Sequence, residues 1–384
     1  MKKLITGLLS MIALGASVGC GSGASQEVAN VIPNSGTLAL DLTPSDSSAT
    51  PVATDSSSQV AQGLTAPDCH PHLFQRTHEV VKRLNRHIFK IMARADAAID
   101  HHPKAQIGNV YVWEKVIAGI SVKHTLTKVS DTQFSFETDV KLEAAPDAAY
   151  VKVASGTVTT TDGQPHTGSG TISFDLTALA SVVSTEQARG QITVAYSVSG
   201  PTKTLQIHVA NFTFDDDGAR PPRNANYVYQ RTLGVGGSLK FQEDVVLFCP
   251  QNPNLSSASV ETVSRWAKIN GSIVGRSDSR GTGGQIPSGD AWLGLTCFDI
   301  SQPVAADPDA ERYWQMKLEN GNGQVLTGDA TYNASDASHP TSSCNPSVFG
   351  PVPDLGSNLN DFNFSAINFG DGSVVPYPGQ PVGQ

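Results

Sequence analysis

The sequence predicts a mainly β protein, in which one large antiparallel sheet, curved or closed into a half-barrel, packs on a long N-terminal amphipathic helix. Two periodicities support this fold class. Apolar residues recur every 3.6 positions over His72–Asp100, and every second position through most of the stretch from Asn109 to Leu326. Turn signals separate the alternating stretches without helical interludes, which favours an antiparallel meander over βαβ units.

The helix is predicted over His72–Asp100, with Asp68 as a possible N-cap and Pro103 as the stop. Its opposite face carries mostly basic side chains, which could contact acidic head groups or a polysaccharide. A simple solvated face is the alternative. The apolar stripe contains Leu73, Val80, Val81, Leu84, Ile88, Ile91, Met92, Ala95, Ala98 and Ile99. The polar face contains Arg76, Lys82, Arg83, Arg86, Lys90 and Arg94 against Glu79, Asp96 and Asp100.

The clearest strand is Thr132–Glu143, where Phe134, Phe136, Val140 and Leu142 are expected on or near one face. About a dozen strands are expected between Asn109 and Leu326, while 254–271 could form either a short helix or a strand. Because one sizeable helix is available to cover the apolar face, the sheet is expected to wrap around it. Similar alternation occurs over 171–179, 191–198, 203–214 and 238–248.

Composition divides the rest of the chain. Residues 20–68 are rich in Ser, Thr, Pro and Ala, which predicts that the 48 residues after Cys20 form a disordered tether with a root-mean-square span of roughly 35–40 Å. Within it, Val31–Leu42 could form a strand that docks elsewhere. Residues 69–344 are expected to fold as one domain, followed by an irregular, Pro- and Gly-rich tail over 345–384.

The first residues predict export. Lys2 and Lys3 precede an apolar run, Leu4–Val18, that is typical of a secretory leader and too short for a stop-transfer helix. The formal net charge of the chain is -9, and loss of the two lysines with residues 1–19 would take it to -11. Such a protein has no electrostatic reason to bind nucleic acid.

The residues around Cys20 resemble the cleavage site of bacterial lipoproteins. The matching residues are Ser17, Val18, Gly19 and Cys20, of which Gly19 and Cys20 fit well, whereas Ser17 stands where leucine is usual. The resemblance implies a signal peptide over residues 1–19 and acylation of Cys20, for example with palmitate. Gly21, in place of Asp, implies the outer membrane, on its periplasmic or surface side. The alternative is an ordinary leader cut near Ala24.

Four further cysteines, an even number, predict two disulfides in an exported protein. Three pairings are possible, of which we favour Cys297–Cys344 with Cys69–Cys249. The absence of a CxxC motif disfavours a zinc ribbon or a thioredoxin-like redox site.

The sequence presents only weak candidates for catalysis or metal binding. A G-x-S-x-G string at 15–19 falls inside the leader, and Ser169 precedes a strand rather than a strand-to-helix turn. His101 and His102 could hold a metal with a carboxylate, and His87 is expected to be a packed core histidine. Asp215 and Asp217 have calcium-loop spacing, but a hairpin turn explains them better.

Aromatic residues could line a sugar or lipid groove, although core positions are the favoured interpretation. They are Trp113, Trp266, Trp292, Trp314, Tyr227, Tyr229 and Tyr313. No catalytic residue, metal site or cofactor is therefore predicted. We expect a lipid-anchored envelope protein that binds lipid, polysaccharide or other envelope proteins without catalysis.

Two other functions remain open from the sequence. The first is a lipid or lipoprotein carrier with an apolar cavity between helix and sheet, which resembles the half-barrel carriers of outer-membrane lipoprotein transport in architecture only. The second is a secreted hydrolase.

Overall fold

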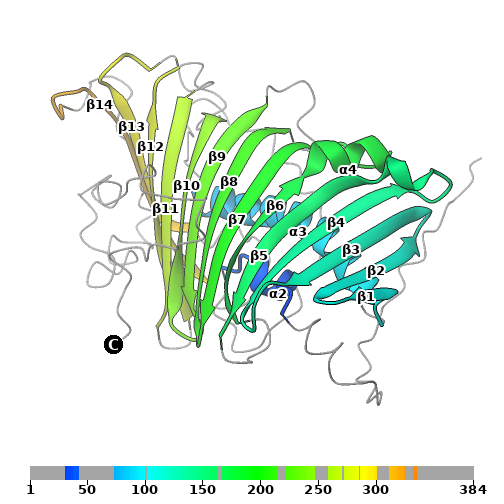
Figure 1. Cartoon of the computed structure of the whole chain (residues 1–384). Helices are drawn as coiled ribbons and strands as arrows, with labels where there is room; N and C mark the ends of the chain where they lie inside the picture. Colours follow the sequence, from blue (N-terminus) through cyan, green and yellow to red (C-terminus); the bar gives the residue numbers. More distant parts are fainter. Residues whose placement is uncertain are drawn as a thin grey trace, which may run out of the picture.

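The computed structural model describes residues 31–42, 73–99, 102–161, 167–213, 222–246, 258–269, 272–284, 286–300, 311–324 and 332–334. One curved sheet of fifteen strands dominates this part of the chain (Figure 1). Its helices are α2 (Ser35–Leu38), α3 (Leu73–Ile99), the short 3-10 helix η1 (Asp147–Ala149) and α4 (Leu176–Val182). Its strands are β1 (Ala105–Ile107), β2 (Val110–Ile117), β3 (Ile120–Lys128), β4 (Gln133–Leu142), β5 (Val151–Thr160), β6 (Gly168–Asp175), β7 (Arg189–Ser199), β8 (Thr202–Thr213), β9 (Arg223–Thr232), β10 (Gly236–Val246), β11 (Ala258–Ile269), β12 (Ser272–Thr282), β13 (Ala291–Ile300), β14 (Glu311–Glu319) and β15 (Tyr332–Ala334).

The sheet is an uninterrupted antiparallel meander. Each strand pairs with its neighbours in chain order, and β1 and β15 form two edges that do not pair with each other among the described strands. This confirms the predicted mainly β, antiparallel, curved sheet. Thirteen strands, β2–β14, lie within the predicted range Asn109–Leu326, and the two short edge strands extend the sheet beyond it.

The structure settles one stretch whose secondary structure the sequence left open, and it corrects a second. Residues 254–271, which left helix and strand open, contain strand β11. The strand expected over 171–179 ends at Asp175, because the Asp175 side chain accepts a hydrogen bond of 2.8 Å from the backbone N–H of Ala178. That N-cap starts helix α4, so the strand prediction is wrong from Leu176 onward.

Helix α3 crosses the inner face of the sheet from one side to the other. It contacts β2 and β3 on one side and β11, β12 and β13 on the other. A helix of 27 residues is about 40 Å long, whereas eleven strand spacings from β2 to β13 cover about 53 Å along a sheet. A straight rod can contact both groups of strands only if the sheet bends around it, so α3 lies on the concave side.

Each end of α3 is fastened to the sheet. Near its C-terminal end, Lys115 of β2 donates a hydrogen bond of 3.2 Å from Nζ to the carbonyl of Ala97, one of the helix-end carbonyls without a partner in the helix. Near its N-terminal end, the hydroxyl of Thr77 lies 2.7 Å from that of Ser264, which in turn lies 2.7 Å from that of Ser277.

Small residues let the N-terminal end of α3 approach the sheet closely. Gly275 of β12 leaves room for the ring of Phe298, and that ring packs at a tilt against Phe74 of α3, with 4.3 Å between centroids. A Cβ placed at Gly275 would lie 1.9 Å from the Phe298 ring. The absence of a side chain at Gly275 is therefore needed for this helix–sheet contact.

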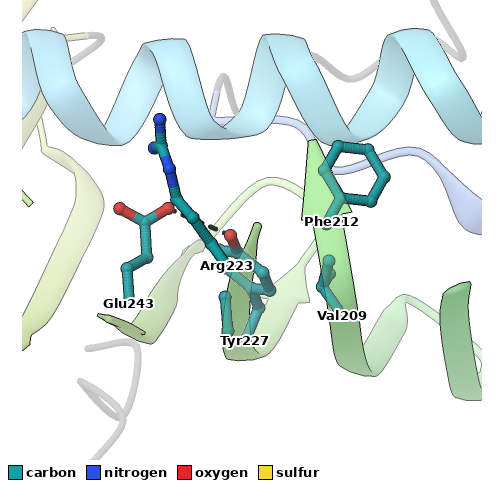
Figure 2. A pocket seen from close by; sticks show the side chains of 6 residues that line it. Val209, Phe212, Arg223, Tyr227 and Glu243 are labelled. Carbon is teal, nitrogen blue, oxygen red and sulfur yellow. Dashed lines mark hydrogen bonds between the residues drawn. The ribbon is translucent and has the colours of Figure 1, made fainter. Parts of the chain in front are cut away.

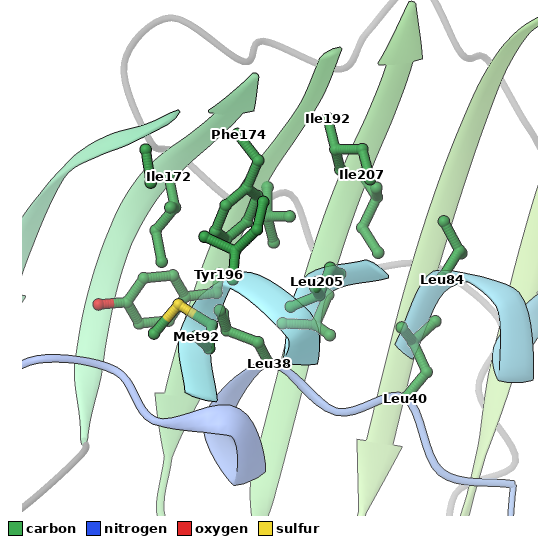
Figure 3. Packing of buried hydrophobic residues seen from close by; sticks show 14 of the residues in the cluster. Leu38, Leu40, Leu84, Met92, Ile172, Phe174, Ile192, Tyr196, Leu205 and Ile207 are labelled. Atoms are coloured by element: carbon green, nitrogen blue, oxygen red, sulfur yellow. The ribbon is translucent and has the colours of Figure 1, made fainter. Parts of the chain in front are cut away.

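The alternation of side chains separates a packed inner face from a polar outer face. Across β6, β7 and β8 the inner positions are apolar and almost fully buried, for example Ile172, Val194 and Ile207, which are neighbours across the sheet. Figure 3 shows part of this layer between the strands and α3. Most outer positions of the same strands are polar, for example Ser173 and Thr193, so the large apolar side chains lie on the helix side there.

We expect Gly275→Ala to lower the free energy of unfolding by about 1–3 kcal/mol, because the new methyl group must displace the buried Phe298 ring. Gly281→Ala on the same strand is the matched control, since its Cβ would meet neighbours at 3.7 Å, an ordinary contact. Chemical denaturation of both variants measures the difference. Equal midpoints for the two variants would contradict the proposed contact.

Candidate functional site

The most distinctive site in the described domain is a groove filled by the chain's own N-terminal segment. Val31–Leu42, called the docked segment below, lies between α3 and the inner face of the sheet, with Ile32, Leu38 and Leu40 at most 2% exposed. Figure 3 shows Leu38 and Leu40 among core side chains of α3 and the strands. The expectation of a free tether throughout 20–68 is thus wrong for Val31–Leu42.

The local sequence explains the shape of the docked segment. Asn34 accepts hydrogen bonds from the backbone N–H and the hydroxyl of Thr37, at 2.8 and 3.1 Å, and so caps the single turn of α2. Ala39 follows α2 with extended backbone angles, and the side chains of Leu38, Leu40 and Leu42 are buried, as is Ala39 itself. The alternative prediction, in which Val31–Leu42 docks on the domain, is confirmed. The segment does not form a strand, however, but a helical turn followed by an extended stretch outside the sheet.

Asn85 of α3 substitutes for a neighbouring strand. Its Oδ1 accepts a hydrogen bond of 2.9 Å from the N–H of Leu40, and its Nδ2 donates one of 2.7 Å to the carbonyl of Leu40. One side chain therefore satisfies both backbone groups of a buried residue, which would otherwise lose their water without compensation.

Cationic and aromatic groups from β8 and β9 hold the other side of the docked segment. Lys203 donates from Nζ to the carbonyls of Gly36 and Ala39, at 3.0 and 2.5 Å. Arg231 pairs with the carboxylate of Asp41 at 2.9 Å. The hydroxyl of Tyr229 donates to the carbonyl of Asp41 at 2.8 Å. These contacts recognise backbone carbonyls and one carboxylate, so they fit an extended peptide.

Burial alters the protonation of this site. The pKa of the Lys203 ammonium is lowered to about 8, chiefly by desolvation and also by the nearby Arg231, while Asp41 opposes the shift. Burial also raises the pKa of Tyr229, which keeps its hydroxyl protonated as a donor.

A second polar cluster lies where α3 crosses β9 and β10. Arg76 pairs with Glu243 at 3.1 Å, and the hydroxyl of Tyr227 donates to the other carboxylate oxygen of Glu243 at 3.0 Å. Burial lowers the pKa of Arg76 and raises that of Tyr227, with Glu243 opposing the first shift and adding to the second. Figure 2 shows Glu243 and Tyr227 beside Arg223, with α3 passing over them.

The cavity at this cluster is too small for an organic ligand. Val209, Phe212 and Ala225 line it together with the polar residues, and its volume is about 10 Å³. This is no more than one water molecule requires. The cluster therefore fits a structural role, in which a buried acid and base neutralise each other at the helix–sheet contact.

The basic face of α3 is partly used inside the domain. Besides Arg76, Lys90 contacts Glu186 at 3.3 Å, and Glu186 is only 3% exposed. The prediction that the whole basic face is either solvated or ligand-binding is therefore wrong for Arg76 and Lys90. Arg76 fastens the helix to the sheet, and Lys90 fastens it to the α4–β7 connection. Arg86 is exposed.

The other candidate residues are mostly structural or lie outside the described residues. Trp113, Trp266, Tyr227 and Tyr229 belong to the core, and Trp292 is buried, which confirms the core interpretation for these five. The remaining candidates without a described side chain are Trp314, Tyr313, Asp215, Asp217, His101, Cys20, Cys69, Cys249 and Cys344.

His87, Ser169 and Cys297 can be placed. His87 is 1% exposed and meets Phe212 edge-on at 5.2 Å, which confirms a packed core histidine. Ser169 lies on β6. Cys297 is buried on β13 and disulfide-bonded. The pairing with Cys344 stays a prediction, as does Cys69–Cys249.

Within the described ranges, no three His, Cys, Asp or Glu side chains gather in a way that could hold a metal ion. Among the described helices, none has the length and apolar character needed to cross a bilayer.

Sequence reasoning missed the residues that hold the docked segment. Asn85 is an ordinary polar residue on a predicted helix, and Lys203 and Arg231 are isolated cations on predicted strands. Their partners are 45 to 190 positions away in the chain. The one usable signal was the alternation of Leu38, Leu40 and Leu42 within a polar stretch.

We expect Asn85→Ala to loosen the docked segment, because both polar backbone groups of Leu40 lose their partner. The cost should be about 1–3 kcal/mol for the buried groups left unpaired. Limited proteolysis followed by mass spectrometry should show faster cleavage within Val31–Leu42. Arg86→Ala, at the exposed neighbouring position, is the control, and equal cleavage in both variants would count against the groove.

The lowered pKa of Lys203 predicts a pH dependence of stability. Between pH of about 8 and the ordinary lysine value of 10.5, the unfolded chain keeps a proton that the folded chain has released. The contribution of this group to the free energy of unfolding therefore rises with pH in that window. Lys203→Met removes the group. The wild-type minus variant difference, from denaturation at pH 7 to 10, should grow with pH, and a flat difference would disprove the shift.

Comparisons with known proteins add nothing to this geometry. No family model, no curated protein and no solved structure matches the chain. The function has to be argued from the docked segment, the leader and the packed interior.

Proposed function

We propose that the protein is an exported lipoprotein of the bacterial cell envelope, acylated at Cys20 and held at the outer membrane. Its folded part works as a non-enzymatic binding or structural module. The leader and the residues around Cys20 support the export and the anchor.

The observation that carries this proposal is the position of the docked segment. Only ten residues, 21–30, separate Cys20 from Val31, the first described residue, which packs against the core. Ten residues span at most about 35 Å when fully extended, and about 16–19 Å on average as a flexible chain. The anchor would hold the domain against the membrane, instead of letting it move on the 48-residue tether that the composition predicted.

The packed interior supports a module without a transported ligand. Between α3 and the described strands of the curved sheet, the side chains form one continuous apolar cluster. The cavity beside Glu243 measures about 10 Å³, whereas ligand pockets usually measure about 300–1,000 Å³. The lipid or lipoprotein carrier and the secreted hydrolase have no comparable observation in their favour.

The buried charges support the same conclusion. Glu243 forms an ion pair with Arg76, and Glu186 forms one with Lys90. Both basic residues belong to α3. Arg276 forms a two-point contact with Asp278, at 2.9 and 2.7 Å, and both are 1% exposed. Groups that satisfy one another within the fold are suited to holding it together.

Mass spectrometry of the mature protein from its native membrane tests the anchor. We expect the chain to begin at Cys20 with the mass of an acylated cysteine, because the leader predicts cleavage before that residue. Cys20→Ser should abolish the lipid mass and move the protein from the membrane to the soluble fraction. Ser22→Ala is the matched control and should keep both. An unmodified N-terminus at another residue would overturn the proposal.

A further inference from the structure

The turns of an up-and-down sheet alternate between its two ends. Turns that follow odd-numbered strands lie at one end, here called the anchor end, and include 107–110, 128–133, 199–202 and 232–236. Turns that follow even-numbered strands lie at the other end, here called the far end, and include 117–120, 142–151 and the connection with α4. Figure 1 shows α4 at the far end and α2 toward the opposite one.

The anchor end exposes large apolar side chains at its turns. Ile107 is 76% exposed, Val129 62% and Leu233 44%. They belong to the turns β1–β2, β3–β4 and β9–β10, so they come from well-separated strands of the sheet. Turn positions normally carry polar residues. Exposed apolar side chains at several turns of one end therefore indicate a contact with another apolar surface.

Charge distinguishes the two ends. Among the turn residues of the anchor end whose side chains are described, Lys128 and Asp131 are the charged ones, and they neutralise each other at 2.8 Å. The far end also exposes apolar side chains, Val116 at 48% and Leu142 at 54%. Acids outnumber bases among the turn residues there whose side chains are described and not fully buried, namely Glu143, Asp147, Asp175, Asp290 and Glu319 against Arg189 and Arg223. Anionic lipid head groups would repel the far end and not the anchor end.

The docked segment is fastened near the anchor end. Lys203, which binds the carbonyl of Gly36, stands two positions after Pro201 in the β7–β8 turn. Arg231, which pairs with Asp41, stands one position before the last residue of β9. The chain that leads back to Cys20 is therefore fixed to the domain close to the apolar turns.

We infer that the anchor end rests on the lipid bilayer that holds the acyl chains of Cys20, with Ile107, Val129 and Leu233 at the lipid interface. The inference rests on the proposed lipid anchor. The short link of ten residues and the fastening of α2 at this end bring these turns to the surface. The far end, with its acids, then faces away from the membrane.

Tryptophan quenching by brominated lipids tests this orientation. The mature lipoprotein is placed in phosphatidylcholine vesicles with brominated acyl chains, and single variants Ile107→Trp and Val129→Trp are compared with Val116→Trp and Leu142→Trp. All four positions are exposed, so each substitution adds a reporter without disturbing the core. We expect at least a twofold loss of the added fluorescence at the anchor-end positions and little loss at the far-end positions.

Equal or reversed quenching at the two ends would overturn the inference. Hydrogen exchange of the wild-type protein needs no substitution and provides a second measurement: residues 128–133 should exchange more slowly on vesicles than in detergent, while 142–151 should not change. Failure of the anchor itself looks different, because a protein without acylated Cys20 would not sediment with vesicles at all. Bound protein with equal quenching refutes only the orientation.

Discussion

The span of helix α3 is the constraint on which the domain depends. The helix is shorter than the row of strands it contacts, so the sheet must bend until both groups of strands reach it. Once bent, the sheet has an inner face with room for one helix and one extended segment, and the apolar residues of all three meet there. The small residues Gly275, Ser264 and Ser277 set how closely one end of the helix approaches, and Lys115 closes the other end.

Buried ion pairs also fix the position of α3. The basic residues Arg76 and Lys90 on α3 reach acids contributed by the rest of the domain, so that one ion pair joins the helix to the sheet and the other joins it to the α4–β7 connection. Pairs of this kind add little net stability, because both ions lose water. Each removes the freedom of the helix to slide or rotate, however, since any other position would leave a buried carboxylate without its partner.

The sequence predicted what depends on local periodicity and missed what depends on distant partners. Alternation around Phe134 and Phe136 identified the strands, and the two faces followed from it. The start of α4 was missed, because the N-cap role of Asp175 depends on where its strand ends. The groove was missed because Asn85, Lys203 and Arg231 have no common motif, and each matters only through a segment that looked like a linker.

The docked segment also sets an order of events for folding. Asp41 and Arg231 are 190 positions apart, and Lys203 is 167 positions from Gly36. Contacts this distant in sequence close late, because the entropy of a long loop must be overcome first. The N-terminal part of the chain emerges before β8 and β9 exist, and it has to wait for them. In the lipoprotein that we propose, Cys20 would therefore reach the processing enzymes of the membrane on a chain whose core is still open, and the domain would close only afterwards, beside the bilayer.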